Sequence, residues 1–210
     1  MDLSEFNEHR QARLVSMSSK EALDKSRFFT ALGNQRLPES VNDITNFANK
    51  MESQEYKHGQ LSKSQYLAHP YRLASLLINY FPRANKSYIK LALCHNIIEV
   101  SDVNHSLAAY LGDELMGFVS VLTVNREKQW DANYKNVYYD KIGQEKITRV
   151  IKVFDKLDNL FTLSENDDDQ VKIMYLKEIE KHVMPFVILD IPSLENYFKT
   201  IVKINYDLIG

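Results

Sequence analysis

The residues of this sequence best suited to metal chemistry are two histidines and an aspartate in separate segments. They are His69, His95 and Asp155, and Asn96 and Asn159 lie close by in the chain. Imidazole nitrogens and carboxylate oxygens are ligands of divalent transition ions. A spacing of four residues places Asp155 and Asn159 on one face of a helix. The sequence therefore offers a ligand-type residue in each of three segments.

Each candidate ligand lies in a segment whose apolar residues repeat at helical spacing. His95 and Asn96 lie in the segment 88–99, whose apolar residues repeat at helical spacing, so both polar side chains are expected beside a hydrophobic core. Polar side chains buried there need a hydrogen-bonding partner or a metal. Amphipathic segments at 66–80 and 151–160 carry His69 and Asp155 in the same way. Three helices should therefore position the candidate ligands.

The fold class is predicted to be all-α. The chain has 210 residues with only six glycines and five prolines, and most of it shows helical rather than alternating periodicity. We expect an N-terminal helical extension over residues 1–40, whose periodicity ends near residue 36, and a domain over residues 41–210. Within the domain, helices are predicted at residues 41–57, 66–81, 86–99, 104–124, 133–141, 144–164, 169–183 and 192–208.

Composition and charge limit the expected cellular location and the expected binding partners. The net charge is −2 and no basic cluster resembles a surface for duplex nucleic acid. Cys94 is the single cysteine, so no disulfide framework exists and a reducing, cytoplasmic location is expected. The N-terminus is polar, and no run approaches eighteen consecutive apolar residues, so neither export nor a membrane span is expected.

Taken together, these motifs resemble those of the HD-domain metal-dependent phosphohydrolases. The likeness is closest to the Rel/Spo-type alarmone (guanosine tetraphosphate) pyrophosphohydrolases of the stringent response, with their motifs His-Pro, His-Asp-x-x-Glu-Asp and Asp-Lys-Leu-x-Asn-Leu. The matching residues here are His69-Pro70, His95-Asn96 followed by Glu99, and Asp155-Lys156-Leu157-x-Asn159-Leu160. The resemblance extends over about residues 42–185 and implies an HD-domain helical bundle.

The resemblance also implies roles for individual residues. His69, His95 and Asp155 would be metal ligands, with Asn96 in the place of the fourth, and the ion would be manganese. Such an ion polarises a phosphoryl oxygen and lowers the pKa of a bound water. Glu99 would act on that water as the catalytic acid or base.

The implied partner is a phosphorylated nucleotide. Asn159 matches a residue that would contact it. The basic residues Lys57, His58 and Lys63, which precede the first motif, are candidates to pair with its phosphates, although the family's Arg-Lys pair is not recognisable there.

Two residues depart from the family pattern. Asn96 replaces an aspartate, and its neutral carbonyl oxygen is a weaker ligand than a carboxylate. With a divalent ion and Asp155 as the one charged ligand, the coordinating groups sum to about +1 instead of 0. Val100 replaces the second acidic residue of the pair that begins with Glu99. Both changes are expected to weaken the chemistry of the site, which is metal binding for Asn96 and catalysis for Val100, and to leave the fold intact.

Simpler interpretations exist for single residues. His95 alone is also typical of a core histidine that donates to a backbone carbonyl. Asp155 followed by Lys156 is also compatible with an ordinary surface ion pair.

Three functions remain compatible with the sequence. The first is a manganese-dependent pyrophosphohydrolase of a guanosine polyphosphate or related nucleotide, impaired by Asn96 and Val100. The second is a catalytically degenerate module that binds a nucleotide or a protein in a regulatory role. The third is another HD-type phosphohydrolase, such as a nucleoside monophosphate phosphatase, although His69-Pro70 favours the Rel/Spo type. The apolar residues of the extension would dock on the core or on a second subunit, which makes a homo-oligomer possible.

Overall fold

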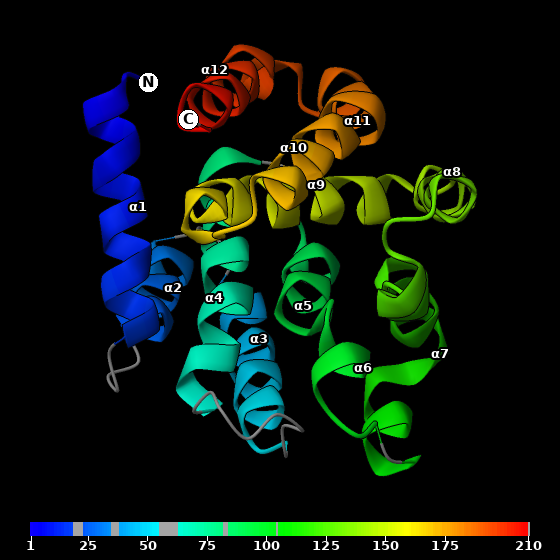
Figure 1. Cartoon of the computed structure of the whole chain (residues 1–210). Helices are drawn as coiled ribbons and strands as arrows, with labels where there is room; N and C mark the ends of the chain where they lie inside the picture. Colours follow the sequence, from blue (N-terminus) through cyan, green and yellow to red (C-terminus); the bar gives the residue numbers. More distant parts are fainter. Residues whose placement is uncertain (19–22, 35–37, 55–62, 82–83, 104, 210) are drawn as a thin grey trace. The chain divides into compact units, whose positions relative to one another are not determined.

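The structure is a computed structural model, and it is built from helices (Figure 1). It describes residues 1–18, 23–34, 38–54, 63–81, 84–103 and 105–209, without the side chains of 17–18, 38–40 and 63–66. Among these residues no strand is found. The prediction of an all-α fold is confirmed.

The chain divides into two compact units. One contains Met1–Met17 and Glu127–Gly210, and the other contains Ser18–Arg126. The boundary predicted near residue 40 coincides with neither division. His69 and His95 belong to the second unit and Asp155 belongs to the first, so each unit is described by itself.

In the unit Ser18–Arg126, α4 and α5 are the central helices. α4 contacts α2 and α5, and α5 also contacts α3 and α7 (Figure 1). The side chain of Asn85 caps α5 by accepting from the amides of Ser87 and Tyr88, which explains why the helix begins there. The helices of this unit are α2 (Leu23–Gly33), α3 (Pro38–Glu52), α4 (Lys63–Tyr80), α5 (Lys86–Cys94), α6 (Ile97–Val100) and α7 (His105–Leu122).

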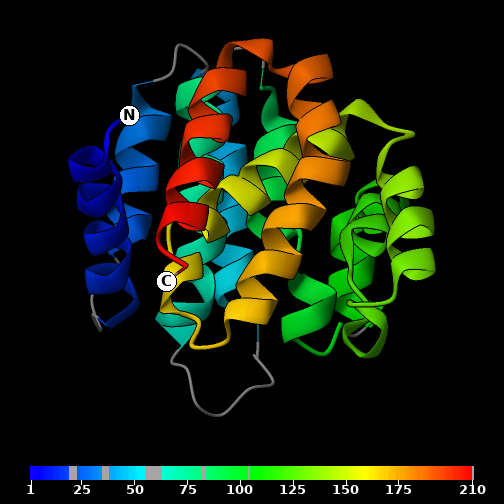
Figure 2. The ribbon, with the colours of Figure 1, turned by 45° about the horizontal axis from the view of Figure 1, so that its top comes forward.

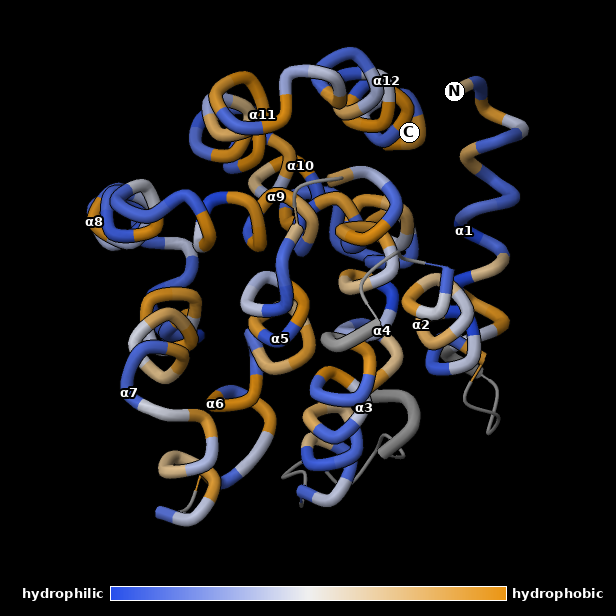
Figure 3. The backbone as a smooth tube through the Cα atoms, turned by 180° about the vertical axis from the view of Figure 1, so that it is seen from behind, coloured by the Kyte–Doolittle hydropathy of each residue, from blue (hydrophilic) through white to orange (hydrophobic). Residues whose placement is uncertain are grey.

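In the other unit, α9 (Lys146–Leu160) is the central helix. It contacts α8, α11 and α12, and almost all its side chains are buried. Figure 2 shows α11 and α12 side by side, and hydrophobic and hydrophilic residues alternate along α12, as expected for a helix with one buried face (Figure 3). The remaining helices are α1 (Leu3–Ser18), α8 (Ala132–Ile142), α10 (Asp169–Glu178), the π-helical turn η3 (Ile179–Val183), α11 (Met184–Asp190) and α12 (Glu195–Asp207).

Some predicted bounds were wrong. The helix predicted over 86–99 is two helices, because the chain turns at His95–Asn96 between α5 and α6. The region up to residue 36 was predicted to be helical without helix bounds, and it contains α1 and α2. The helix predicted to end at residue 183 continues through η3 into α11, where Pro185 occupies a first-turn position that does not need an amide hydrogen.

The α7 region is long and apolar, yet it is not one continuous helix. By length and composition alone, His105–Lys128 could cross a membrane, a criterion that core helices of soluble proteins also meet. Gly112 interrupts it with φ 78° and ψ 162°. The part of α7 after this residue, 113–122, is shorter than the roughly 20 residues that span a bilayer.

Gly112 adopts a backbone conformation that is essentially restricted to glycine. We therefore expect Gly112→Ala to destabilise the protein by about 1–3 kcal/mol through backbone strain alone, because an added Cβ would meet no atom within 4 Å. Gly117→Ala is the matched control in the same helix and should stabilise by roughly 0.5–1 kcal/mol. Urea denaturation would measure both, and equal effects would contradict the assignment of strain to Gly112.

Candidate metal centre

The unit Ser18–Arg126 brings the two candidate histidine ligands together. His69 lies within α4, where Pro70 removes one backbone donor, and His95 lies in the turn after α5. The ring centroids are 5.1 Å apart and the ring planes are inclined by 70°. The two predicted imidazoles therefore come from different helices to one place.

The orientation of His95 is fixed by its backbone neighbour. Its Nδ1 lies 2.8 Å from the carbonyl oxygen of Ala92, and the side chain is buried. In the neutral ring Nδ1–H donates to this oxygen, so Nε2 carries the lone pair. A second ring nitrogen held by a carbonyl is typical of metal-ligating histidines. The two interpretations of His95 from the sequence, as a core residue and as a ligand, are compatible with each other.

Asn96 and Glu99 follow in the same unit. Asn96 is half-buried in the turn between α5 and α6. Both carboxylate oxygens of Glu99 are engaged: Oε1 accepts from the amide of Val124 at 3.1 Å, and Oε2 pairs with Arg126 at 2.5 Å. A water proton would have to compete with Arg126 for this carboxylate. Val100 ends α6, so no second carboxylate adjoins Glu99 in the chain.

Asp155 occupies the middle of α9 in the other unit. Its Oδ2 pairs with Lys152 Nζ at 2.9 Å, and its Oδ1 accepts from Asn159 Nδ2 at 3.1 Å. Burial by itself would lower the pKa of Lys152, but the charge of Asp155, the neighbouring Tyr138 and the hydrogen bonds to both residues together raise that pKa well above its ordinary value. Lys152 is therefore a permanent cation beside Asp155.

The interpretation of Asp155 and Lys156 as a surface ion pair was wrong. Both residues are buried, and Lys156 pairs with Glu178 of α10 at 2.8 Å. Glu178 also pairs with Lys135 at 2.6 Å and accepts from the hydroxyl of Tyr139 at 2.6 Å. Glu178 therefore anchors α8, α9 and α10 to one another.

Tyr175 is a polar residue of this region that the sequence interpretation missed. Lys156 Nζ lies 4.0 Å from the centroid of its ring. Its hydroxyl is buried near Asn159 and makes no hydrogen bond of regular geometry among the described residues. Burial, with Asp155 and Glu178 nearby, raises its pKa well above the ordinary value, so the hydroxyl keeps its proton as a donor. A buried donor of this kind can serve a ligand oxygen.

The charges around Asp155 do not cancel. Lys135, Lys152 and Lys156 contribute three positive charges and Asp155 and Glu178 contribute two negative charges, which leaves +1. No sequence pattern pointed to Glu178 or Tyr175, because both come from α10 rather than from the motif helix. This network of ion pairs therefore carries an excess of one positive charge.

The remaining candidates are placed as follows. Lys57 and His58 lie outside the described residues, and so does the side chain of Lys63, the first residue of α4. Cys94 is fully buried, and burial raises the pKa of its thiol, so it is a packing residue and not a nucleophile.

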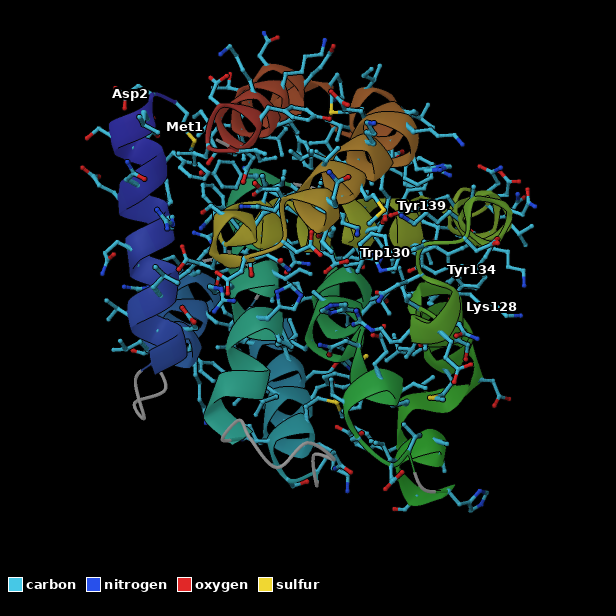
Figure 4. All side chains as sticks on the ribbon, in the orientation of Figure 1. Met1, Asp2, Lys128, Trp130, Tyr134 and Tyr139 are labelled. Atoms are coloured by element: carbon cyan, nitrogen blue, oxygen red, sulfur yellow. The ribbon has the colours of Figure 1, made fainter. Side chains whose placement is uncertain are left out.

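Several aromatic residues lie on α8 and in the turn before it. Figure 4 labels Trp130, Tyr134 and Tyr139, which come from α8 and the turn before it. Trp130 is 40% exposed, and Lys135 Nζ lies 4.6 Å from the centroid of its ring. Tyr139 is buried and stacks on His182 at 4.6 Å between centroids. Tyr139 is therefore a packing residue.

Comparison with known proteins supports the fold. No family model matches the chain, and no curated protein sequence matches it. A solved metazoan structure, described as an ortholog of SpoT that hydrolyses ppGpp, is similar with a TM-score of 0.59 and 19% sequence identity. The similarity covers 81% of this chain and 97% of the other chain. The two proteins share a helical HD-type fold.

Proposed function

We propose that this chain is a metal-dependent nucleotide hydrolase of the HD type that acts on a guanosine polyphosphate such as ppGpp. The observation that carries the proposal is the pair His69 and His95, two imidazoles from separate helices with His95 Nδ1 held by a carbonyl. The structural neighbour hydrolyses ppGpp, which supports the choice of substrate.

The proposed metal ligands are His69, His95 and Asp155, with Asn96 as a weak fourth. This donor set of two imidazoles, a carboxylate and an amide oxygen fits a divalent transition ion, and manganese is the ion that we propose. When bound, such an ion polarises a phosphoryl oxygen and lowers the pKa of a coordinated water. The site and its ion are proposals that rest on the order of the motifs and on the chemistry of the residues.

The other residues would bind and orient the substrate. Asn159 and Tyr175 would donate hydrogen bonds to the nucleotide, and Lys152 would offset the charge of phosphate beside Asp155. We keep Lys57, His58 and Lys63 as further candidates for phosphate binding. Glu99 would accept the proton of the attacking water, in competition with Arg126, so turnover is expected to be slow.

A second candidate function is a binding module without hydrolysis. The observation that favours it is the state of Glu99, which has no acidic neighbour at Val100 and is paired with Arg126. The fold and the positive region around Asp155 would then retain a nucleotide in a regulatory role. Binding of guanosine tetraphosphate without release of pyrophosphate would establish this function.

The test is a hydrolysis assay of the purified chain on guanosine tetraphosphate with added manganese. Release of pyrophosphate that a chelator abolishes is expected. Neither binding nor release of products would overturn both candidate functions.

The ligand set predicts the effect of removing Asp155. Asp155→Ala should weaken manganese binding by at least roughly 100-fold, because the only charged ligand is lost. Electron paramagnetic resonance of unbound manganese would measure it. Asp167→Ala, which removes an exposed carboxylate in a turn, is the matched control and should have no effect. Unchanged occupancy in Asp155→Ala would show that the ligand set is wrong.

A further inference from the structure

Helix α1 is locked to the last turn of α9 by a buried ion pair. Arg13 Nε lies 2.8 Å from Asp158 Oδ1, and the two side chains are 7% and 1% exposed. Arg13 Nη1 also donates to the carbonyl of His9 at 3.0 Å, which fixes the guanidinium to its own helix. The pair therefore joins two rigid elements that are 145 residues apart in the chain.

The same contact surrounds Phe161, the residue that ends α9. The guanidinium carbon of Arg13 lies 4.0 Å from the centroid of this ring, a cation–π distance. Phe6 stacks on the ring at 5.5 Å and His9 contacts it at 5.2 Å. Three residues of α1 thus hold the end of α9.

Asp158 needs this partner. A carboxylate in the last turn of a helix lies at the negative end of the helix dipole, where it is unfavourable. Burial adds a desolvation cost that a well-placed guanidinium offsets. Without Arg13, the last turn would relieve this charge by unwinding or by turning Asp158 toward water.

The last turn of α9 also carries Asn159, whose side-chain amide donates to Asp155. Asp158 and Asn159 are neighbours in the chain, so unwinding of this turn would release the amide from Asp155. We infer that Arg13 is a positioning residue, which holds the last turn of α9 so that Asn159 and Asp155 keep their orientation. This inference rests on the proposed function only for what the oriented pair binds.

A second ion pair on α1 provides the matched control. Arg10 pairs with Glu165, which lies beyond α9 in the turn η2 (Leu163–Glu165), and the two side chains are 31% and 40% exposed. Removing Arg10 takes away a contact between α1 and the rest of the unit without exposing Asp158. Arg10→Ala should therefore leave the last turn of α9 unchanged.

The first readout needs neither metal nor nucleotide. In protein labelled with ¹⁵N-asparagine, the side-chain amide signals of Asn159 report its hydrogen bond to Asp155. Arg13→Ala should shift these signals and speed their exchange with water, whereas Arg10→Ala should not. Since Arg13→Ala removes the guanidinium from the buried Asp158, the paired variant Arg13→Met with Asp158→Leu is measured too, because apolar replacement of both partners preserves folding. The paired variant should leave the Asn159 signals unchanged, because the last turn of α9 then contains no buried carboxylate.

The second readout is manganese affinity, measured on folded protein in the Asn96→Asp background. Arg13→Ala should weaken binding roughly tenfold, as loss of groups that orient metal ligands does, and Arg10→Ala should not. Unchanged Asn159 signals in Arg13→Ala would overturn the inference, whereas altered signals with unchanged affinity would support the positioning of Asn159 and contradict Asp155 as a metal ligand. If Arg13→Ala does not fold, altered Asn159 signals in the paired variant overturn it and unchanged ones support it. If no variant binds manganese, the proposed function fails and the amide signals alone decide the inference.

Discussion

Asn96→Asp should tighten manganese binding by roughly 10- to 100-fold, the range over which changes around metal ligands act. The substitution adds one negative charge, so the coordinating groups and a divalent ion sum to 0 instead of +1. A carboxylate oxygen is also a stronger ligand than an amide oxygen for such an ion. Titration calorimetry with manganese on both proteins would measure the change.

The matched control for charge is Asn7→Asp. Asn7 is exposed on α1, so the control makes the same change in net charge away from the proposed ligands. It should leave manganese affinity unaltered. Equal affinity of the Asn96→Asp variant and the unmodified protein would show that position 96 does not face the metal.

Adding Val100→Asp to Asn96→Asp should raise the rate of pyrophosphate release from guanosine tetraphosphate. The second carboxylate would restore the acidic pair with Glu99, and general acid–base catalysis contributes about 10²–10⁴-fold. Release by the unmodified protein as well would establish a hydrolase that tolerates the amide. Release by the double variant alone would favour the binding module.

Loss of Glu178 should destabilise the fold by about 3–5 kcal/mol, because Lys135 and Lys156 would remain buried without their anion. The Glu178 side chain is 9% exposed. Its burial alone would raise its pKa, but Lys156 and the hydrogen bonds from Lys135 and Tyr139 lower it to about 2, against an ordinary value of 4.5. At 1.36 kcal/mol per pKa unit, this difference corresponds to about 3 kcal/mol of stability.

The sign of the pH dependence follows from that lowered pKa. The stability from Glu178 is fully present above pH 4.5 and is lost as the pH falls toward 2, where the folded protein also takes up the proton. The free energy of unfolding of Glu178→Ala, followed by urea denaturation, should therefore approach that of the unmodified protein at low pH. Glu195→Ala removes the exposed pair with Lys199 and should cost less than about 1 kcal/mol. If the free energy of unfolding fell as little in Glu178→Ala as in Glu195→Ala, the ion pairs of Glu178 would add no stability.

The sequence by itself was enough for the helical fold and for the local motif geometry. Periodicity in 66–81 and 144–164 predicted α4 and α9, because helix formation depends on contacts between residues three and four apart. The same spacing predicted that Asn159 would lie beside Asp155, and the structure shows their hydrogen bond. These properties follow from neighbours in the chain.

Local spacing in the sequence did not predict the break between α5 and α6. The stretch 86–99 is periodic throughout, yet the chain turns at His95 and Asn96, and no glycine or proline marks the turn. The residues of the candidate metal centre interrupt a pattern that favoured one helix.

Tertiary structure alone decided the partners of Lys156 and Asp158. A surface pair of Lys156 with Asp155 was one alternative from the sequence, but Lys156 pairs with Glu178, and Arg13 pairs with Asp158 from 145 residues away. A buried ion needs a counterion from whichever helix packs against it, and that choice depends on how the helices cross rather than on spacing in the chain. For this reason the sequence determined which segment carries each candidate ligand and the local contacts of His95 with Ala92 and of Asp155 with Asn159, whereas packing determined the partners of Lys156 and Asp158.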